Sequence, residues 1–507
     1  MNSDLPNNDA PAEQHLSTDH LMGNLRARTI SSGVVTVFAQ GIKFLLTMGS
    51  TVFLSRLLSP SDFGLVAMVM TTTGFLKVFK EAGLSVATVQ SDKISQAQVS
   101  NLFWINILLS GISTLIIAAA SPVLAWFFRD PRLIGITLAL STTFLLTGAA
   151  VQHLAILNRQ MRFKAIAVVE VGGMLSAVVI GILMAKFDCG YWALVVFQIT
   201  MPAVSLVLVW LISKWRPQLP SRNSGMRPLL RFGADLTASN FITSLAAGID
   251  SMLIGRFSGP DQVGLYSRGG ALVRRPLDQM MTPISTVFVP VLSRLQDQVE
   301  RYRRIFMQIY QATALLSFAF VGLCLPLARP IINVVLGPKW DAVSAIFAAF
   351  TVTALFNPLA IFCCSLFESQ GRGKDFLFAN TTISITSILS FIVGLPYGAT
   401  GVAVAYAVSC VAIQLPIMHY FAGRKGPITA SNLWLGFVKQ VPVFVIVLGA
   451  TYATLYFVTA AYSPIIQIVT GVLAGLIAGA AFVYVYKPAR QCIAGLWLIV
   501  RDLRSKA

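Results

Sequence analysis

Apolar runs of about 20 residues or longer follow one another along most of the chain, separated by short polar segments. A helix of about 20 apolar residues crosses a bilayer core of ~30 Å. Membrane strands would alternate apolar and polar positions, which these runs do not. The pattern therefore predicts an all-α integral membrane protein with about fourteen transmembrane helices. We place these helices at residues 30–55, 61–85, 97–122, 133–157, 165–186, 190–213, 231–256, 261–288, 303–327, 342–367, 375–396, 400–421, 434–458 and 464–486.

Polar stretches predict how the chain is divided. The N-terminal stretch lacks the apolar region and cleavage site of a signal peptide. The longest polar stretch between spans contains proline, serine and glycine, which is typical of a linker. The expected parts are a disordered cytoplasmic tail (1–29), an N-lobe of six helices (30–213), a cytoplasmic linker (214–230), a C-lobe of six helices (231–425), two further helices (426–486) and a basic amphipathic cytoplasmic tail (487–507).

Composition and charge support this prediction and add an orientation. Hydrophobic residues make up 56% of the chain and charged residues 11%. The net charge of +18 comes from Lys and Arg dispersed among the loops, so nucleic acid is not an expected partner. Loops on the side of the N-terminus carry 26 Lys and Arg residues, and loops on the opposite side carry 7. Because cytoplasmic loops are enriched in these residues, both termini are expected in the cytoplasm, with the protein in the bacterial inner membrane.

An internal repeat relates the two halves. At an offset of 200 residues, four positions in one loop match four in another, and at an offset of 210 three more positions match. The pairs are Arg56 with Arg256, Pro60 with Pro260, Gly64 with Gly264, Leu65 with Leu265, Arg162 with Arg372, Lys164 with Lys374 and Ala193 with Ala403. Because the members of each pair fall on the same predicted side, we expect two parallel six-helix repeats, followed by two C-terminal helices.

The order of several motifs resembles a known family. The first half contains LSRLLSPSDFGLVAM (54–68), EAGLSVATVQ (81–90) and LFWINILLSG (102–111). The second half contains GIDSMLIGRFSGPDQVGLYSRGGAL (248–272), then VLSRLQD (291–297). From residue 30 to about 425 the chain is similar to the polysaccharide transporters of the multidrug/oligosaccharidyl-lipid/polysaccharide exporter superfamily. It is most similar to the colanic-acid-exporter type, the Wzx-like oligosaccharide flippases.

The resemblance implies a fold, a mechanism and a cargo. The implied fold has two lobes of the MATE type around a cavity that opens alternately to each side of the membrane. The implied cargo is an undecaprenyl-diphosphate-linked oligosaccharide, used to build an exopolysaccharide, a capsule or a lipopolysaccharide. Membrane lipid, a polysaccharide polymerase and chain-length proteins are the further candidate partners.

The sequence contains no catalytic or metal-binding motif. It has no P-loop, no HExxH and no Ser/His/Asp arrangement, and its six cysteines and four histidines form no metal-ligand spacing. We therefore expect a transporter and not an enzyme, with no cofactor. A proton or sodium gradient is the candidate energy source.

Basic side chains inside the spans are the candidate cargo ligands, because burying a charge in hydrocarbon is costly unless it faces a partner or water. Lys43 lies deep in the first predicted helix, although it could also reach the outer headgroups. Arg268 and Arg275 are seven residues apart and so share a helix face. Arg274 is a third candidate, or the partner of Asp278 in an ion pair. The same helix contains Pro276, where we expect a kink.

The second span is interrupted at a place that corresponds to the arginine-containing helix. Interrupted spans at matching places in two repeats are typical of a transporter's binding site. Lys77 and Lys80 are therefore also candidate cargo ligands, although both lie close enough to the cytoplasm to reach it.

Three acids are candidates for ion coupling, through protonation or by binding the ion. These are Glu170, Glu81 and Asp250. Asp250 could instead pair with Arg256. The sequence leaves three alternatives to the oligosaccharide flippase: a cation-coupled multidrug exporter, a lipid II exporter of the same superfamily, and a membrane scaffold without transport activity. A drug exporter for cations would be expected to carry carboxylates where this chain has arginines.

Overall fold

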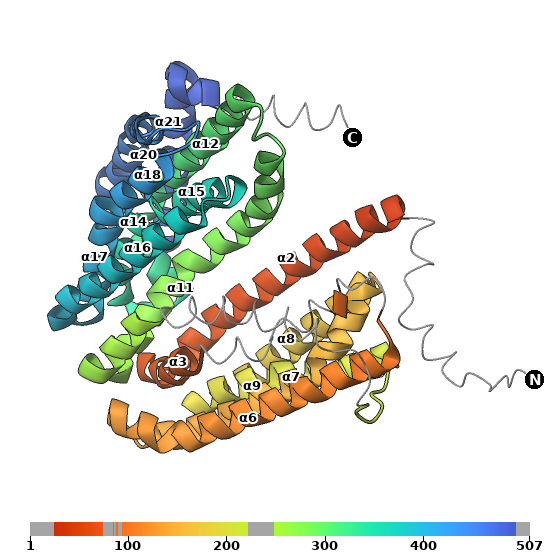
Figure 1. Ribbon diagram of the computed structural model, residues 1–507. Coiled ribbons are helices and arrows are strands. Elements are labelled where there is room, and N and C mark those ends of the chain that lie inside the picture. Colours follow the sequence, from red (N-terminus) through yellow and green to blue (C-terminus); the bar gives the residue numbers. More distant parts are fainter. Residues whose placement is uncertain (1–24, 75–84, 86–87, 90–93, 222–247, 493–507) are drawn as a thin grey trace, which may run out of the picture. The chain divides into compact units, whose positions relative to one another are not determined.

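The computed structural model describes residues 25–74, 85, 88–89, 94–221 and 248–492. The chain divides into two compact units, Met1–Gly264 and Leu265–Ala507, and each is described by itself. In the described part of both units the regular elements are helices (Figure 1). The first unit contains α2 (Leu25–Leu57), α3 (Pro60–Thr73), α6 (Gln96–Phe128), α7 (Arg132–Arg159), α8 (Phe163–Lys186), α9 (Tyr191–Ser213) and the first part of α11 (Ile249–Ser293).

The second unit contains the rest of α11 and a larger number of shorter helices. They are α12 (Val299–Cys324), α13 (Ala328–Val335), η3 (Pro338–Trp340), α14 (Val343–Thr353), α15 (Asn357–Ser369), α16 (Gly373–Gly394), η4 (Leu395–Tyr397), α17 (Gly398–Ser409), η5 (Cys410–Gln414), α18 (Leu415–Gly423), α19 (Ala430–Val438), α20 (Val441–Ala453), η6 (Thr454–Val458) and α21 (Pro464–Val485).

Ten helical stretches among the described residues are long and apolar enough to cross a membrane. One of them, Gly373–Gly423, contains two of the predicted spans. The predicted spans at 61–85, 231–256 and 261–288 give no such stretch. The first two lie partly outside the described residues, and the third is the charged segment of α11. The all-α, multi-pass fold is confirmed, the count of fourteen helices is not, and the domain boundaries proposed from the sequence stay predictions.

Local sequence explains where several helices begin. Ser59 caps α3 by accepting a hydrogen bond from the Asp62 backbone, and the Asp62 carboxylate accepts one from the Ser59 backbone in return. Ser95 and Gln98 form the same reciprocal pair at the start of α6. Each pair satisfies backbone N–H groups that a helix start leaves without intrahelical partners.

The expected kink at Pro276 is not where α11 leaves helical geometry. The non-helical residue of α11 is Gly259, whose φ of 85° and ψ of 178° suit glycine. Proline fixes φ near the helical value, so it removes one hydrogen bond without forcing the dihedral angles out of the helical region. The break at Gly259 falls in the predicted loop between the spans 231–256 and 261–288, and residues 249–293, on both sides of this loop, form one helical element.

The repeat is visible in the backbone at two matching turns. Helix α7 ends before Met161, which has φ +52°, and α15 ends before Gly371, which has φ +65°. The next residues, Arg162 and Arg372, precede α8 and α16 with nearly identical φ and ψ of −83° and 57°, and −88° and 50°. The positions that match at an offset of 210 residues in the sequence therefore also share a backbone conformation.

The two copies of the motif that repeats at an offset of 200 residues pack against each other through their backbones, inside the first unit. A Cβ added at Gly64 would overlap the carbonyl group of Pro260, and a Cβ added at Gly264 would overlap that of Pro60. The contact is reciprocal: the glycine of each motif lies against the proline of the other. Glycine is required at both places by this close approach.

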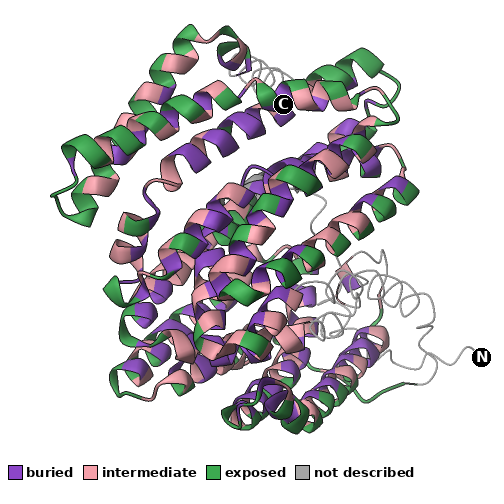
Figure 2. Cartoon of the chain, turned by 90° about the vertical axis from the view of Figure 1, so that its left-hand side faces the viewer, coloured by how far each residue is buried: buried purple, intermediate pink, exposed green. Residues whose placement is uncertain are grey.

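Helix surfaces are apolar outside as well as inside. Exposed positions run along the helices in Figure 2, and they include large apolar side chains such as Leu45, Val123, Trp126 and Val485. Apolar side chains at this density on an exposed surface are suited to a lipid environment. The structure thus agrees with a multi-pass membrane protein.

Candidate functional site

The first unit contains an ion pair between two of its helices, away from the helix ends. Lys43 of α2 donates a hydrogen bond from Nζ to Oε2 of Glu170 in α8, over 2.9 Å. Their side chains are 25% and 36% exposed. From the sequence, Lys43 is a candidate cargo ligand and Glu170 a candidate coupling group, and the structure brings the two together. We call them the transmembrane ion pair.

The position of this pair indicates contact with water. Lys43 lies near the middle of α2, and Glu170 lies ~10 Å from the start of α8 at 1.5 Å per residue. Two charges at this depth are costly in hydrocarbon, and their mutual attraction offsets only part of that cost. A partly exposed pair is expected to face a hydrated space.

The candidate arginines lie on α11 in the second unit. Arg274 and Arg275 are exposed, whereas Arg268 is half-buried. The guanidinium of Arg274 lies over the ring of Phe350 in α14, 4.6 Å from its centroid. Arg268 and Arg275 are seven residues apart on α11 and so lie on the same face of that helix. Arg275 is therefore an exposed cation, whereas Arg274 is held against an aromatic ring.

The remaining candidates are placed differently or are not described. Asp250 is buried at the start of α11, where its carboxylate accepts a hydrogen bond from the Ser251 backbone over 2.7 Å. Lys77, Lys80 and Glu81 lie outside the described residues.

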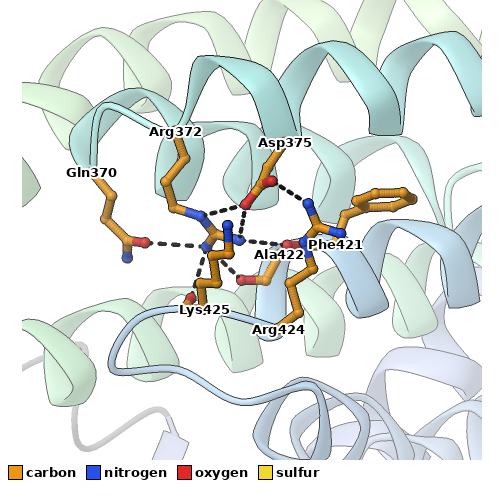
Figure 3. Close-up of polar contacts among 7 residues, drawn as sticks. All are labelled: Gln370, Arg372, Asp375, Phe421, Ala422, Arg424 and Lys425. Carbon is orange, nitrogen blue, oxygen red and sulfur yellow. Dashed lines mark hydrogen bonds and ion pairs between the residues drawn. The ribbon is translucent and has the colours of Figure 1, made fainter.

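A cluster of polar contacts at the start of α16 was not predicted (Figure 3). The guanidinium of Arg372 donates to the carboxylate of Asp375 and to the backbone carbonyls of Phe421, Ala422 and Lys425. Arg424 donates to the other oxygen of Asp375. That hydrogen bond raises the pKa of Arg424 above its usual value. We call Arg372, Asp375 and Arg424 the α16 clasp.

The predicted linker is also bound more firmly than its composition suggests. Four side chains of α6 bind it. Gln96 donates to the Arg216 carbonyl and accepts from the indole N–H of Trp215. Asn101 holds the Ser221 backbone through both its N–H and its carbonyl, over 2.9 and 2.7 Å. Ser100 accepts from the backbone of Gln218, and Trp104 donates to the carbonyl of the same residue. The segment 215–221 therefore lies along α6 as a strap.

A cavity of about 650 Å³ lies within the second unit. Side chains of α11, α15, α16 and α18 line it, and most are apolar, including Phe356, Ile361 and Met418. Glu368 and Asn380 are its charged and amide side chains. No sequence signal pointed to it, because its lining comes from four helices.

The fold and these intramembrane charges define a class of protein: a polytopic membrane transporter. Two solved structures share the fold. The lipid II flippase MurJ, in an inward closed conformation, is similar with a TM-score of 0.70 and 17% sequence identity, covering 90% of this chain and 99% of that one. An inward-facing multidrug resistance MATE family transporter of the MOP superfamily gives a TM-score of 0.55 and 14% identity, covering 80% and 94%.

The family follows from sequence comparison. Residues 53–345 match the family model described as polysaccharide biosynthesis protein, and the chain belongs to this family. It is 24% identical over 411 residues to the teichuronic acid biosynthesis protein TuaB of Bacillus subtilis, covering 80% of this chain and 82% of that protein. It is 24% identical over 439 residues to the lipopolysaccharide biosynthesis protein WzxC of Escherichia coli, covering 83% and 87%. The succinoglycan biosynthesis transport protein ExoT of Rhizobium meliloti is 24% identical over 317 residues, covering 62% and 64%. The resemblance seen in the sequence motifs is confirmed.

Proposed function

We propose that this protein is a flippase that carries an undecaprenyl-diphosphate-linked oligosaccharide across the bacterial inner membrane for surface polysaccharide synthesis. Three observations support the proposal: the family, the relatives named for polysaccharide biosynthesis and transport, and a fold shared with a lipid II flippase. The main observation in favour of an anionic cargo is the presence of cationic side chains within membrane helices. An anionic diphosphate needs such partners in order to leave the headgroup region.

The arginines of α11 suit a diphosphate better than lysines would. A guanidinium presents several N–H donors in a planar fork and binds a phosphate through two parallel hydrogen bonds. Arg275 is exposed and lies seven residues after Arg268, so the two place positive charge on one face of α11. We propose that these two arginines, the cationic strip, hold the diphosphate or acidic sugars of the cargo during alternating access.

Orientation and energy source belong to the same proposal. The loop-charge count supports cytoplasmic termini, and a gradient of protons or sodium ions supplies the energy. The proposed partners beyond the cargo and membrane lipid are a polymerase and chain-length proteins. A second candidate, a multidrug exporter, is supported by the similarity to the MATE transporter. The cationic strip argues against it, because cationic drugs would be repelled there.

A deletion strain tests the proposed cargo. Loss of the protein should stop export of one surface polysaccharide and cause a lipid-linked oligosaccharide to accumulate on the cytoplasmic leaflet. Extraction of membrane lipids and mass spectrometry of the diphosphate-linked fraction would identify it. Normal polymer export together with increased drug sensitivity would support the multidrug exporter instead.

Substitution of the arginines tests the cationic strip. Arg275→Ala should reduce export at least tenfold, since a charge-assisted phosphate contact in a partly dry site is worth about 1.5–3 kcal/mol. Arg275→Lys should keep part of the activity, because lysine keeps the charge without the fork. Arg274→Ala, which removes the contact with Phe350, serves as the matched control and should lower protein abundance more than export per molecule. Normal export by a variant carrying both Arg268→Ala and Arg275→Ala would disprove the strip.

A further inference from the structure

The transmembrane ion pair leaves its lysine already occupied. Lys43 is a candidate ligand for an anion, yet its Nζ donates to Glu170 over 2.9 Å. A diphosphate that binds Lys43 must therefore compete with the Glu170 carboxylate. Both side chains are partly exposed, so the described helices of the first unit do not enclose the pair.

The helices around the pair contain few other charged residues that could neutralise Lys43 or bind an anion in its place. Helices α7 and α9 pack against α8, as α2 does. Apart from the pair, the charged residues of these four helices lie in their terminal turns, and α9 has none. The nearest charged residue along α8 is Lys164, six positions before Glu170, and α7 also contains His153, which is buried between Trp210 and Trp215.

We infer that Glu170 is an internal counter-ion which the diphosphate of the cargo displaces from Lys43. This inference rests on the proposed function, since it concerns the same cargo. In the empty protein Glu170 neutralises Lys43. When the diphosphate binds, its oxygens take the place of the carboxylate beside Nζ, and the Glu170 carboxylate loses its ammonium partner.

Displacement of the carboxylate couples binding of the cargo to binding of a proton. A carboxylate without a cationic partner, next to a bound polyanion, binds a proton from the solvent more readily than one in an ion pair. Cargo binding is then accompanied by uptake of a proton at Glu170, and the ion pair forms again only after both the cargo and that proton have left. Apart from the O–H bond that forms and breaks at the Glu170 carboxylate, no covalent bond changes in this cycle.

Binding of an isoprenoid diphosphate to the full-length protein in lipid nanodiscs tests the exchange. Farnesyl diphosphate is the probe, and calorimetry in buffers of different ionisation enthalpy gives both affinity and proton uptake. Glu170→Gln should bind the probe about fivefold more tightly at pH 7.5, the upper range for a partly exposed ion pair, and take up fewer protons than the wild type. Titration of the probe itself is common to both proteins and cancels. Glu300→Gln, at an exposed position in the first turn of α12, is the control and should match the wild type.

Two further variants complete the test. Lys43→Gln should weaken binding, and adding Glu170→Gln to it should then have no effect, because the counter-ion has nothing left to neutralise. Should Glu170→Gln fail to fold, a double variant, Lys43→Glu with Glu170→Lys, keeps both charges with their positions exchanged. A second double variant, Lys43→Gln with Glu170→Lys, then lacks the counter-ion and must bind the probe more tightly than the first.

The outcomes separate this inference from the proposed function. Unchanged or weaker binding by Glu170→Gln, in a protein whose wild type binds the probe, overturns the exchange and leaves the flippase proposal standing. Failure of the wild type to bind any isoprenoid diphosphate, with normal polymer export in the deletion strain, overturns both.

Discussion

Asp375 is the acidic residue on which the α16 clasp depends. It is 4% exposed and accepts hydrogen bonds from both Arg372 and Arg424. Arg372 also binds carbonyls at the end of α18, where a cation complements the negative end of the helix. In the first repeat Ala165 occupies the position that corresponds to Asp375, so the clasp is specific to the second unit.

We expect Asp375→Asn to destabilise the second unit. The change leaves two guanidinium groups without their carboxylate, and breaking a buried ion pair costs about 3 kcal/mol. Asp341→Asn is the matched control: it breaks the exposed pair of Asp341 and Arg329, whose side chains are 44% and 72% exposed, and should lower the unfolding temperature much less. Thermal unfolding of the two purified variants would show the difference, and equal shifts would contradict the role assigned to burial.

The sequence identifies single candidate residues but not the residues that they contact. Lys43 and Glu170 were recognisable because a charge inside an apolar run is unusual. Their contact was not, since 127 residues separate them and hydrophobic periodicity does not say which helices are neighbours. From the sequence, Arg372 is one of the loop charges that indicate orientation. Its partners in α18 are backbone carbonyls, which every residue has, so the sequence does not reveal these hydrogen bonds.

At the level of elements, the reciprocal contact of the repeated motifs makes a sharp prediction. Gly64→Ala and Gly264→Ala should each destabilise the protein by about 1–3 kcal/mol, because the new methyl group meets a backbone carbonyl that cannot rotate away. Gly49→Ala in α2 is the control. Its added methyl group meets no atom within 4 Å, and it should be neutral or stabilising. The contact would be refuted if all three variants unfolded at the wild-type temperature.

Elements were predicted best where length and hydrophobicity decide them. The apolar runs correspond to helices throughout the described residues. The strap was predicted only as a linker, because it binds α6 mainly through its backbone, and backbone hydrogen bonds leave no pattern in the sequence. The break in α11 was expected at Pro276 and lies at Gly259, where the sequence shows an ordinary glycine next to Pro260.

For the whole molecule, the charge distribution predicts which side each loop faces. In a variant without the six native cysteines, a cysteine at position 258 should react with a membrane-impermeant thiol reagent in intact cells. A cysteine at position 220, in the strap, should react only after the cells are opened. Labelling of position 220 and not of 258 in intact cells would reverse the orientation. This experiment is independent of the cargo, so it tests the topology alone.

The two matching turns at Met161 and Gly371 carry information about the origin of the chain. Glycine adopts a positive φ without strain, whereas for a residue with a Cβ this region costs about 1–2 kcal/mol. Both turns close a helix with the same hydrogen bond, from Arg162 N–H to the Leu157 carbonyl and from Arg372 N–H to the Phe367 carbonyl. Duplication of a single ancestral segment accounts for the agreement, and it also accounts for the mismatch in residue type. The turn has been inherited twice, and in the first copy it has persisted with a side chain that does not favour it.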